Sequence, residues 1–161
     1  MRKGQGMHVL DMDRDLCESF LIDRYHATTE PLTDGCGFKA SFPCGNGSDN
    51  ALGRPMTIDG ALETTISFLP YDMADRNVIS IWTSSLSNID EASKLEAMNI
   101  CNNAVLVHRP RFLKPFIDDD GSFYCGAQGF VDEEASPLRL IRAFLEEIDE
   151  FWPTVQMMRM L

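Results

Sequence analysis

The sequence has no apolar run that approaches the roughly 20 residues that a helix needs to span a bilayer. It begins with the basic segment Met1-Arg2-Lys3-Gly4, but no apolar stretch follows, and a secretory signal requires one. We therefore expect neither a membrane-spanning helix nor a signal peptide, and we expect a cytoplasmic protein.

Positive charge is also scarce. The 161 residues include 14 Lys and Arg against 25 Asp and Glu, which gives a net charge of −11 at pH 7. Nucleic-acid binding needs Lys and Arg to offset phosphates, and anionic membranes attract basic segments, so the composition argues against both partners. The acidity fits a surface charged only for solubility, or one that keeps an adhesive partner in solution.

The five cysteines include no CxxC pair of the kind found in redox and zinc sites. Three of them lie among apolar neighbours in predicted elements, which indicates small core residues. These are Cys17, Cys101 and Cys125. The other two, Cys36 and Cys44, flank a short predicted strand. Together with His26 they support the alternative that we keep, a small thiol- or metal-dependent enzyme.

Catalytic and ion-binding patterns are otherwise missing. Asp118-Asp119-Asp120-Gly121 lacks the alternating ligands and the closing Glu of a calcium loop. The glycine-rich segment 43–53 is not followed by the lysine and helix start of a phosphate-binding loop. The three histidines have no carboxylate or cysteine partner at a helical or strand interval. We expect no catalytic residues, no cofactor and no metal.

The clearest folding signal is the pair Asp120-Gly121. Asp tolerates the left-handed backbone geometry of a tight turn, and Gly adopts it without a steric penalty. Alternating side chains predict a strand at 111–117 before the turn and another at 122–130 after it. The two strands and the turn predict a β-hairpin.

Helices are expected on both sides of this hairpin. The first runs over 90–103, and its inner face is expected to carry Leu95, Met98 and Asn99. The second runs over 137–152, where apolar residues recur at intervals of three and four. Pro153 is expected to end it.

The first half of the chain predicts one helix that ends near Tyr25 and then three strands. The helix begins at Asp11 or Asp13, and its inner stripe is expected to be Leu16, Phe20 and Tyr25. The strands are predicted at 37–42, 62–68 and 78–85, with 56–58 as a possible start of the second.

The order of the elements is therefore α-β-β-β-α-β-β-α, which indicates an α+β fold with helices packed on one mainly antiparallel, twisted sheet. We expect residues 1–10 to form a flexible leader, 11–155 a single domain and 156–161 a C-terminal tail.

Several local sequences between residues 60 and 155 carry a family resemblance. They are the asparagine-bearing segment 95–103, Arg111-Phe112, the turn at 118–121, and the acidic helix end Asp149-Glu150-Phe151-Trp152-Pro153. With the order of elements, they resemble the YbjN family of small bacterial proteins. YbjN proteins are similar in fold to class I type III secretion chaperones, which are acidic, usually dimeric, and bind an extended client segment. The resemblance implies a non-enzymatic, chaperone-like or regulatory role.

The C-terminal methionines are the candidate contact residues. Methionine adapts to irregular partners, and Met157, Met158 and Met160 follow Phe151 and Trp152 in the sequence. These five residues either pack on the protein's own sheet or a dimer contact, or they form a patch that binds a client. We predict a homodimer that binds another polypeptide.

Overall fold

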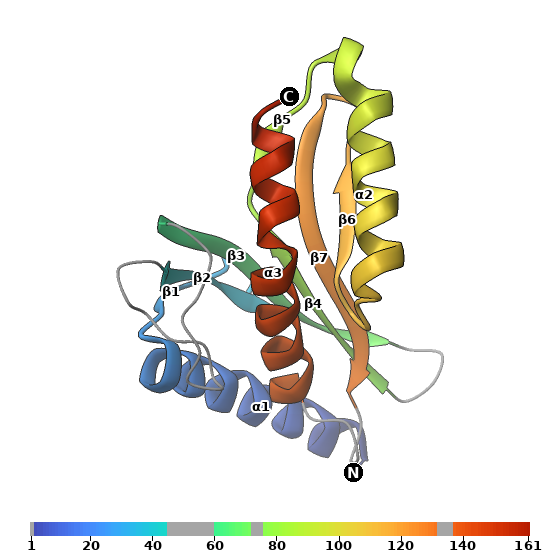
Figure 1. Cartoon of the computed structure of the whole chain (residues 1–161). Helices are drawn as coiled ribbons and strands as arrows, with labels where there is room; N and C mark the ends of the chain where they lie inside the picture. Colours follow the sequence, from blue (N-terminus) through green and yellow to red (C-terminus); the bar gives the residue numbers. More distant parts are fainter. Residues whose placement is uncertain (1, 45–59, 72–75, 132–136) are drawn as a thin grey trace.

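The computed structural model of the chain describes residues 2–44, 60–71, 76–131 and 137–161 (Figure 1). In this part of the chain, three helices pack on a seven-stranded antiparallel sheet, which confirms the predicted α+β class. The possible strand start at 56–58 and the glycine-rich segment after Cys44 lie outside the described residues.

The elements follow one another as α1 (Arg2–Tyr25), β1 (Thr28–Pro31), β2 (Gly37–Cys44), β3 (Gly60–Tyr71), β4 (Arg76–Thr83), β5 (Ser87–Asn88), a 3-10 turn (Glu91–Ser93), α2 (Lys94–His108), β6 (Lys114–Ile117), β7 (Ser122–Val131) and α3 (Pro137–Arg159). The strands lie in the order β1-β2-β3-β4-β7-β5. Trp82 of β4 and Lys114 of β6 both pair with Gly126, so β4 and β6 flank β7 on opposite edges.

One face of the sheet carries the core. Side chains alternate along each strand, so Phe38 and Phe42 of β2, Ile81 of β4, and Phe123 and Cys125 of β7 are all buried on the same side. α1 contacts β2 and α3 contacts β7 on this side, while α2 packs beside α3 (Figure 1). No described helix covers the opposite face.

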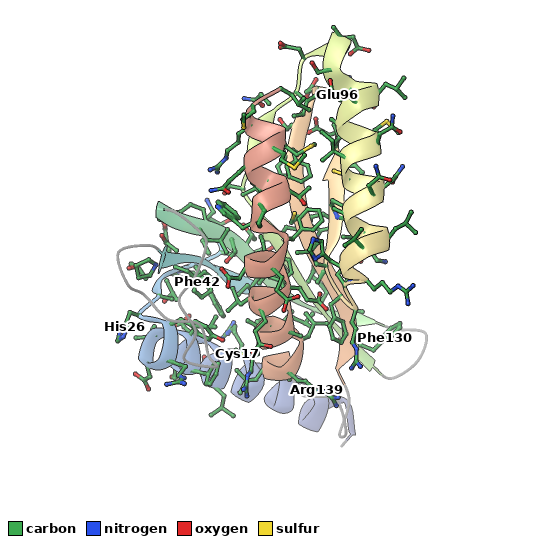
Figure 2. The ribbon with its side chains drawn as sticks, viewed as in Figure 1. Cys17, His26, Phe42, Glu96, Phe130 and Arg139 are labelled. Carbon is green, nitrogen blue, oxygen red and sulfur yellow. The ribbon has the colours of Figure 1, made fainter. Side chains whose placement is uncertain are left out.

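The predicted start of the first helix at Asp11 or Asp13 is wrong, because α1 begins at Arg2. The predicted inner stripe of this helix is also wrong at Leu16, which is 56% exposed. Among the described side chains of this helix, Cys17, Leu21 and Tyr25 are buried, and they lie four positions apart on one side. α1 contacts β2, and Cys17 is labelled in Figure 2. The Tyr25 ring packs edge-on against Phe42, with 6.0 Å between centroids.

The predicted end of the last helix is wrong as well. α3 continues through Pro153 to Arg159, so the expected tail at 156–161 is mostly helical. A proline inside a helix costs one backbone hydrogen bond. Beyond it, however, Thr154, Val155 and Met158 are buried, and their packing holds the last turns in place.

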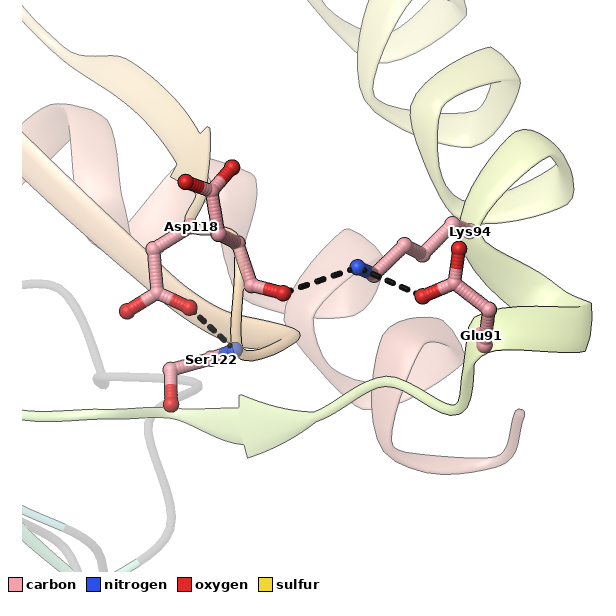
Figure 3. Close-up of polar contacts among 5 residues, drawn as sticks. Glu91, Lys94, Asp118 and Ser122 are labelled. Atoms are coloured by element: carbon pink, nitrogen blue, oxygen red, sulfur yellow. Dashed lines mark hydrogen bonds and ion pairs between the residues drawn. The ribbon is translucent and has the colours of Figure 1, made fainter.

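The predicted hairpin turn is confirmed. Gly121 has a φ of +84°, and its N–H donates to the Asp118 carbonyl at 3.0 Å. The Asp118 carboxylate accepts the Ser122 N–H at 2.9 Å (Figure 3). Lys94, at the start of α2, donates to the Asp119 carbonyl at 3.0 Å and forms an ion pair with Glu91 at 2.7 Å. These contacts tie the turn to the helix that precedes the hairpin.

Candidate functional site

The outward face of α2 exposes four large apolar side chains. Small residues face inward: Ala97, Cys101 and Ala104 are buried. The large apolar residues face solvent, which overturns the predicted inner face. They are Leu95, Met98, Leu106 and Val107, with exposed fractions of 72%, 53%, 71% and 75%.

This face also lacks charge. The eleven residues from Ala97 to Val107 include no Asp, Glu, Lys or Arg, although 24% of the whole chain is charged. Glu96 lies before this stretch, near the start of the helix (Figure 2). Asn99, Asn102 and Asn103 are exposed among the apolar side chains. The outward face of α2 is therefore apolar and amide-bearing rather than charged.

The structure separates the five predicted contact residues at the C-terminus. Phe151, Trp152 and Met158 are buried in the core, so they are not available at the surface of the single chain. Met157 and Met160 are exposed, at 51% and 86%. The predicted patch therefore consists, at the surface, of these two methionines.

The end of α3 is held in place by Arg159. Its Nε donates to the Leu86 carbonyl at 2.9 Å, and its guanidinium lies 5.0 Å from the centroid of the Trp152 ring. A cation above an indole ring stabilises the pair by about 0.5–1 kcal/mol at an exposed site. The methionines thus sit on an ordered helix end that belongs to the fold.

The three residues of the thiol- or metal-dependent alternative lie at different places relative to β2. Cys36 precedes β2 and Cys44 is its last residue, so eight strand positions separate them by about 26 Å. The pairing of Thr28 with Ser41 places His26 nearer to the Cys44 end. Among the described residues, no group of three His, Cys, Asp or Glu side chains is arranged to hold a metal ion.

The three core cysteines are buried, and burial raises the thiol pKa of two of them, Cys101 and Cys125. Cys17, Cys101 and Cys125 are buried, as predicted. Burial raises the pKa of Cys101 to about 11. Burial, with Cys101 nearby, also raises the pKa of Cys125. Because thiolates are the reactive form, these cysteines are suited to packing rather than to nucleophilic chemistry.

The connection between α2 and β6 is built on one carboxylate of α3, which the sequence did not reveal. The Arg111 N–H donates to Glu147 Oε1 at 2.6 Å. The N–H groups of Phe112 and Leu113 donate to Oε2 at 3.0 and 2.7 Å. These bonds draw residues 111–113 away from β7, which is why β6 begins at Lys114 rather than at the predicted residue 111.

A pocket of about 210 Å³ lies beside this connection. It is lined by His108, Arg109, Pro110, Arg111, Glu147, Glu150 and Phe151. The Glu147 carboxylate is already engaged by three backbone N–H groups, and no Ser, Thr, Cys or Lys lines the pocket. The Glu147 carboxylate at this pocket therefore supports the connection between α2 and β6.

Comparisons of the chain with protein-family models, with curated proteins and with solved structures found no match. No helix in the described ranges combines the length and the apolar character needed to cross a membrane.

Proposed function

We propose that the protein is a non-enzymatic interaction module, a homodimer that binds another polypeptide in the chaperone-like or regulatory way that the YbjN resemblance implies. The observation that carries this proposal is the exposed, uncharged outward face of α2.

The residues of this face have the spacing of a helix–helix contact. Leu95, Met98, Asn102 and Leu106 follow one another at intervals of three, four and four. An exposed helix of a monomeric protein normally turns its polar side outward. In helix pairs, by contrast, leucine and methionine fill the contact, and an occasional asparagine fixes the register at some cost in stability.

The lack of charge on this face is the feature that would let a second copy of the chain approach there. Each chain carries a net charge of −11, so two copies repel one another over most of their surfaces. Repulsion is weakest where charge is lacking, and the stretch from Ala97 to Val107 has none. At 1.5 Å per residue, its length along the helix is about 16 Å, or three turns. Interface centres are likewise depleted of Asp, Glu and Lys.

Light scattering coupled to size-exclusion chromatography tests the dimer. We expect the wild type to have twice the 18.1 kDa mass of the chain. Leu106→Lys places a desolvated charge at the contact and is expected to give the single-chain mass. Leu16→Lys is the matched control, because Leu16 is a similarly exposed leucine on α1 at 56%, and it is expected to leave the dimer intact.

Circular dichroism of the variants shows whether the fold is preserved. A wild type that is monomeric at every concentration measured would refute the dimer. A Leu106→Lys variant that stays dimeric would refute the assignment of the contact to α2.

A further inference from the structure

The sheet face that no described helix covers carries a cluster of aromatic side chains. Trp82 of β4, Phe116 of β6 and Tyr124 of β7 all point to this side, because they alternate with the buried residues of their strands. Phe116 is 52% exposed, while Trp82 and Tyr124 are partly exposed. Phe130, near the end of β7, lies on the same side (Figure 2).

Trp82 lies flat across the middle of this cluster. A Cβ atom on Gly126, its partner on β7, would be only 2.3 Å from the indole ring, so the ring rests directly on the β7 backbone. On the far side of β7, the ring meets Phe116 edge-on, with centroids 6.4 Å apart and an interplanar angle of 79°. Because residue 126 is a glycine, the indole of Trp82 can extend from β4 across β7 to the ring of Phe116 on β6.

The three strands that form the cluster carry no carboxylate among their described side chains on this face, and the neighbouring strand β3 contributes Glu63, which accepts a hydrogen bond from Ser41. Among the described side chains of β4, β6 and β7 on this side, none is Asp or Glu, and Lys114 is the one charged group. The polar neighbours provide N–H and O–H donors, namely the Trp82 indole, the Tyr124 hydroxyl and the Gln128 amide. Such a surface suits a ligand with flat apolar rings and hydrogen-bond acceptors.

We propose that this aromatic face binds a proline-rich segment of a partner polypeptide in the polyproline II conformation. Proline supplies a flat apolar ring and a backbone carbonyl, and it has no backbone N–H that would need an acceptor. Polyproline II makes no internal hydrogen bonds, so its carbonyls are free to accept from the donors beside Trp82. Aromatic-lined surfaces recognise such segments in several unrelated domains.

Other ligands that stack on aromatic rings fit this face less well. Single-stranded nucleic acid needs several Lys or Arg residues along its path, and the described side chains of this face include Lys39 and Lys114 in a chain of net charge −11. A sugar presents many hydroxyl donors, which carboxylates normally accept. The described side chains of β4, β6 and β7 on this face include no carboxylate, and Glu63 of the neighbouring strand β3 already accepts a hydrogen bond from Ser41 at 2.7 Å. Both ligands are included in the test as alternatives to the proline-rich segment.

The test is a titration of the full-length protein with decaproline, followed by tryptophan fluorescence. The chain has two tryptophans, and Trp152 is buried, so a Trp152→Phe background leaves Trp82 as the reporter. We expect a saturable change with a Kd below about 1 mM. A glycine-serine peptide of equal length, a cello-oligosaccharide and oligo-dT are expected to give no saturable change.

Variants locate the site. Phe116→Ala is expected to weaken binding about tenfold, because it removes the ring that holds Trp82. Gly126→Ala is expected to do the same by lifting the indole from β7. Lys39→Ala, on the same sheet face but on β2, is the control and is expected to bind as the wild type does. For these variants, isothermal calorimetry serves as a second readout that does not depend on Trp82 emission.

Failure of decaproline to bind, or equal binding of the glycine-serine peptide, would overturn the inference. So would a preference for the oligosaccharide or for oligo-dT. This inference rests on the proposed polypeptide-binding function, but the dimer is measured separately. A stable dimer that does not bind decaproline would refute only the proline-rich ligand. A monomer that binds decaproline would refute only the proposed dimer.

Discussion

At the scale of single residues, two glycines share a left-handed backbone but differ in their surroundings. Gly35 has a φ of +73°, and a Cβ atom added there would meet nothing within 4 Å. Gly121 has a φ of +84°, but a Cβ there would come within 2.2 Å of the Ile89 carbonyl oxygen. A comparison of alanine variants at the two positions therefore separates the cost of backbone strain from the cost of a steric clash.

We expect Gly35→Ala to lower the free energy of unfolding by about 1 kcal/mol, which is the cost of a left-handed non-glycine residue. Gly121→Ala is expected to lower the free energy of unfolding by at least about 2 kcal/mol more than Gly35→Ala does, because the turn must move away from Ile89. Urea unfolding followed by circular dichroism measures both values. If both variants lost the same free energy of unfolding, the turn at Gly121 would have adapted and the clash with Ile89 would not affect stability.

The sequence located the turn but not the buried stripe of α1, and the reason is local. An Asp-Gly pair has few alternative conformations, so its prediction does not depend on the rest of the fold. Leu16 and Cys17 are neighbours and both apolar, and periodicity cannot choose between stripes that contain one or the other. Only the position of β2 decides that Cys17 and Leu21 face the core.

At the scale of elements, the connection from α2 to β6 depends on Glu147. Its carboxylate accepts N–H groups from Arg111, Phe112 and Leu113 at 2.6 to 3.0 Å. Glu147→Ala is expected to lower the free energy of unfolding by about 2–3 kcal/mol, because three donors lose a charged acceptor. Chemical denaturation measures the loss.

Glu150→Ala is the matched control for this prediction. Glu150 lies on the same helix, is exposed and lines the same pocket, so its removal is expected to change the stability by less than about 0.5 kcal/mol. Glu147→Gln is expected to lower the free energy of unfolding by an amount between those of the two alanine variants, because the amide keeps one acceptor oxygen but loses the charge. If both alanine variants lost the same stability, the carboxylate would not be what holds the connection.

The inner face of α2 shows why a sequence can predict a helix without predicting which side of the helix is buried. The helix has two candidate faces, one of large apolar residues and one of small residues, Ala97, Cys101 and Ala104. Burial in a single domain normally favours the larger face. Here the small face is the buried one, on a helix that packs beside α3. The large face is exposed to solvent, and a partner chain would supply the missing burial.

At the scale of the whole molecule, turn residues and periodicity predicted the α+β class and five of the seven strands. They missed the short strands β1 and β5 and did not indicate the surfaces. The aromatic face depends on the pairing of Trp82 with Gly126, residues 44 positions apart whose alignment is set by the register of β4 on β7. The carboxylate of Glu147 reaches N–H groups 34 to 36 residues away. Such contacts between distant segments leave no local pattern in the sequence.

The net charge of the molecule leads to a last prediction, on how salt affects the proposed dimer. Two chains of −11 repel at long range, and the outward face of α2 contributes no ion pair between Ala97 and Val107 to offset this. Raising the salt concentration from about 0.1 M to 1 M shortens the screening length from about 10 Å to 3 Å. The dissociation constant is therefore expected to fall with added salt.

Sedimentation equilibrium at the two salt concentrations measures this effect, with Leu106→Lys as a variant expected to stay monomeric in both. A dissociation constant that rises with salt would mean that ion pairs hold the two chains together. The contact would then lie on a charged part of the surface, because the exposed leucines, methionine and asparagines of α2 have no charge for salt to screen.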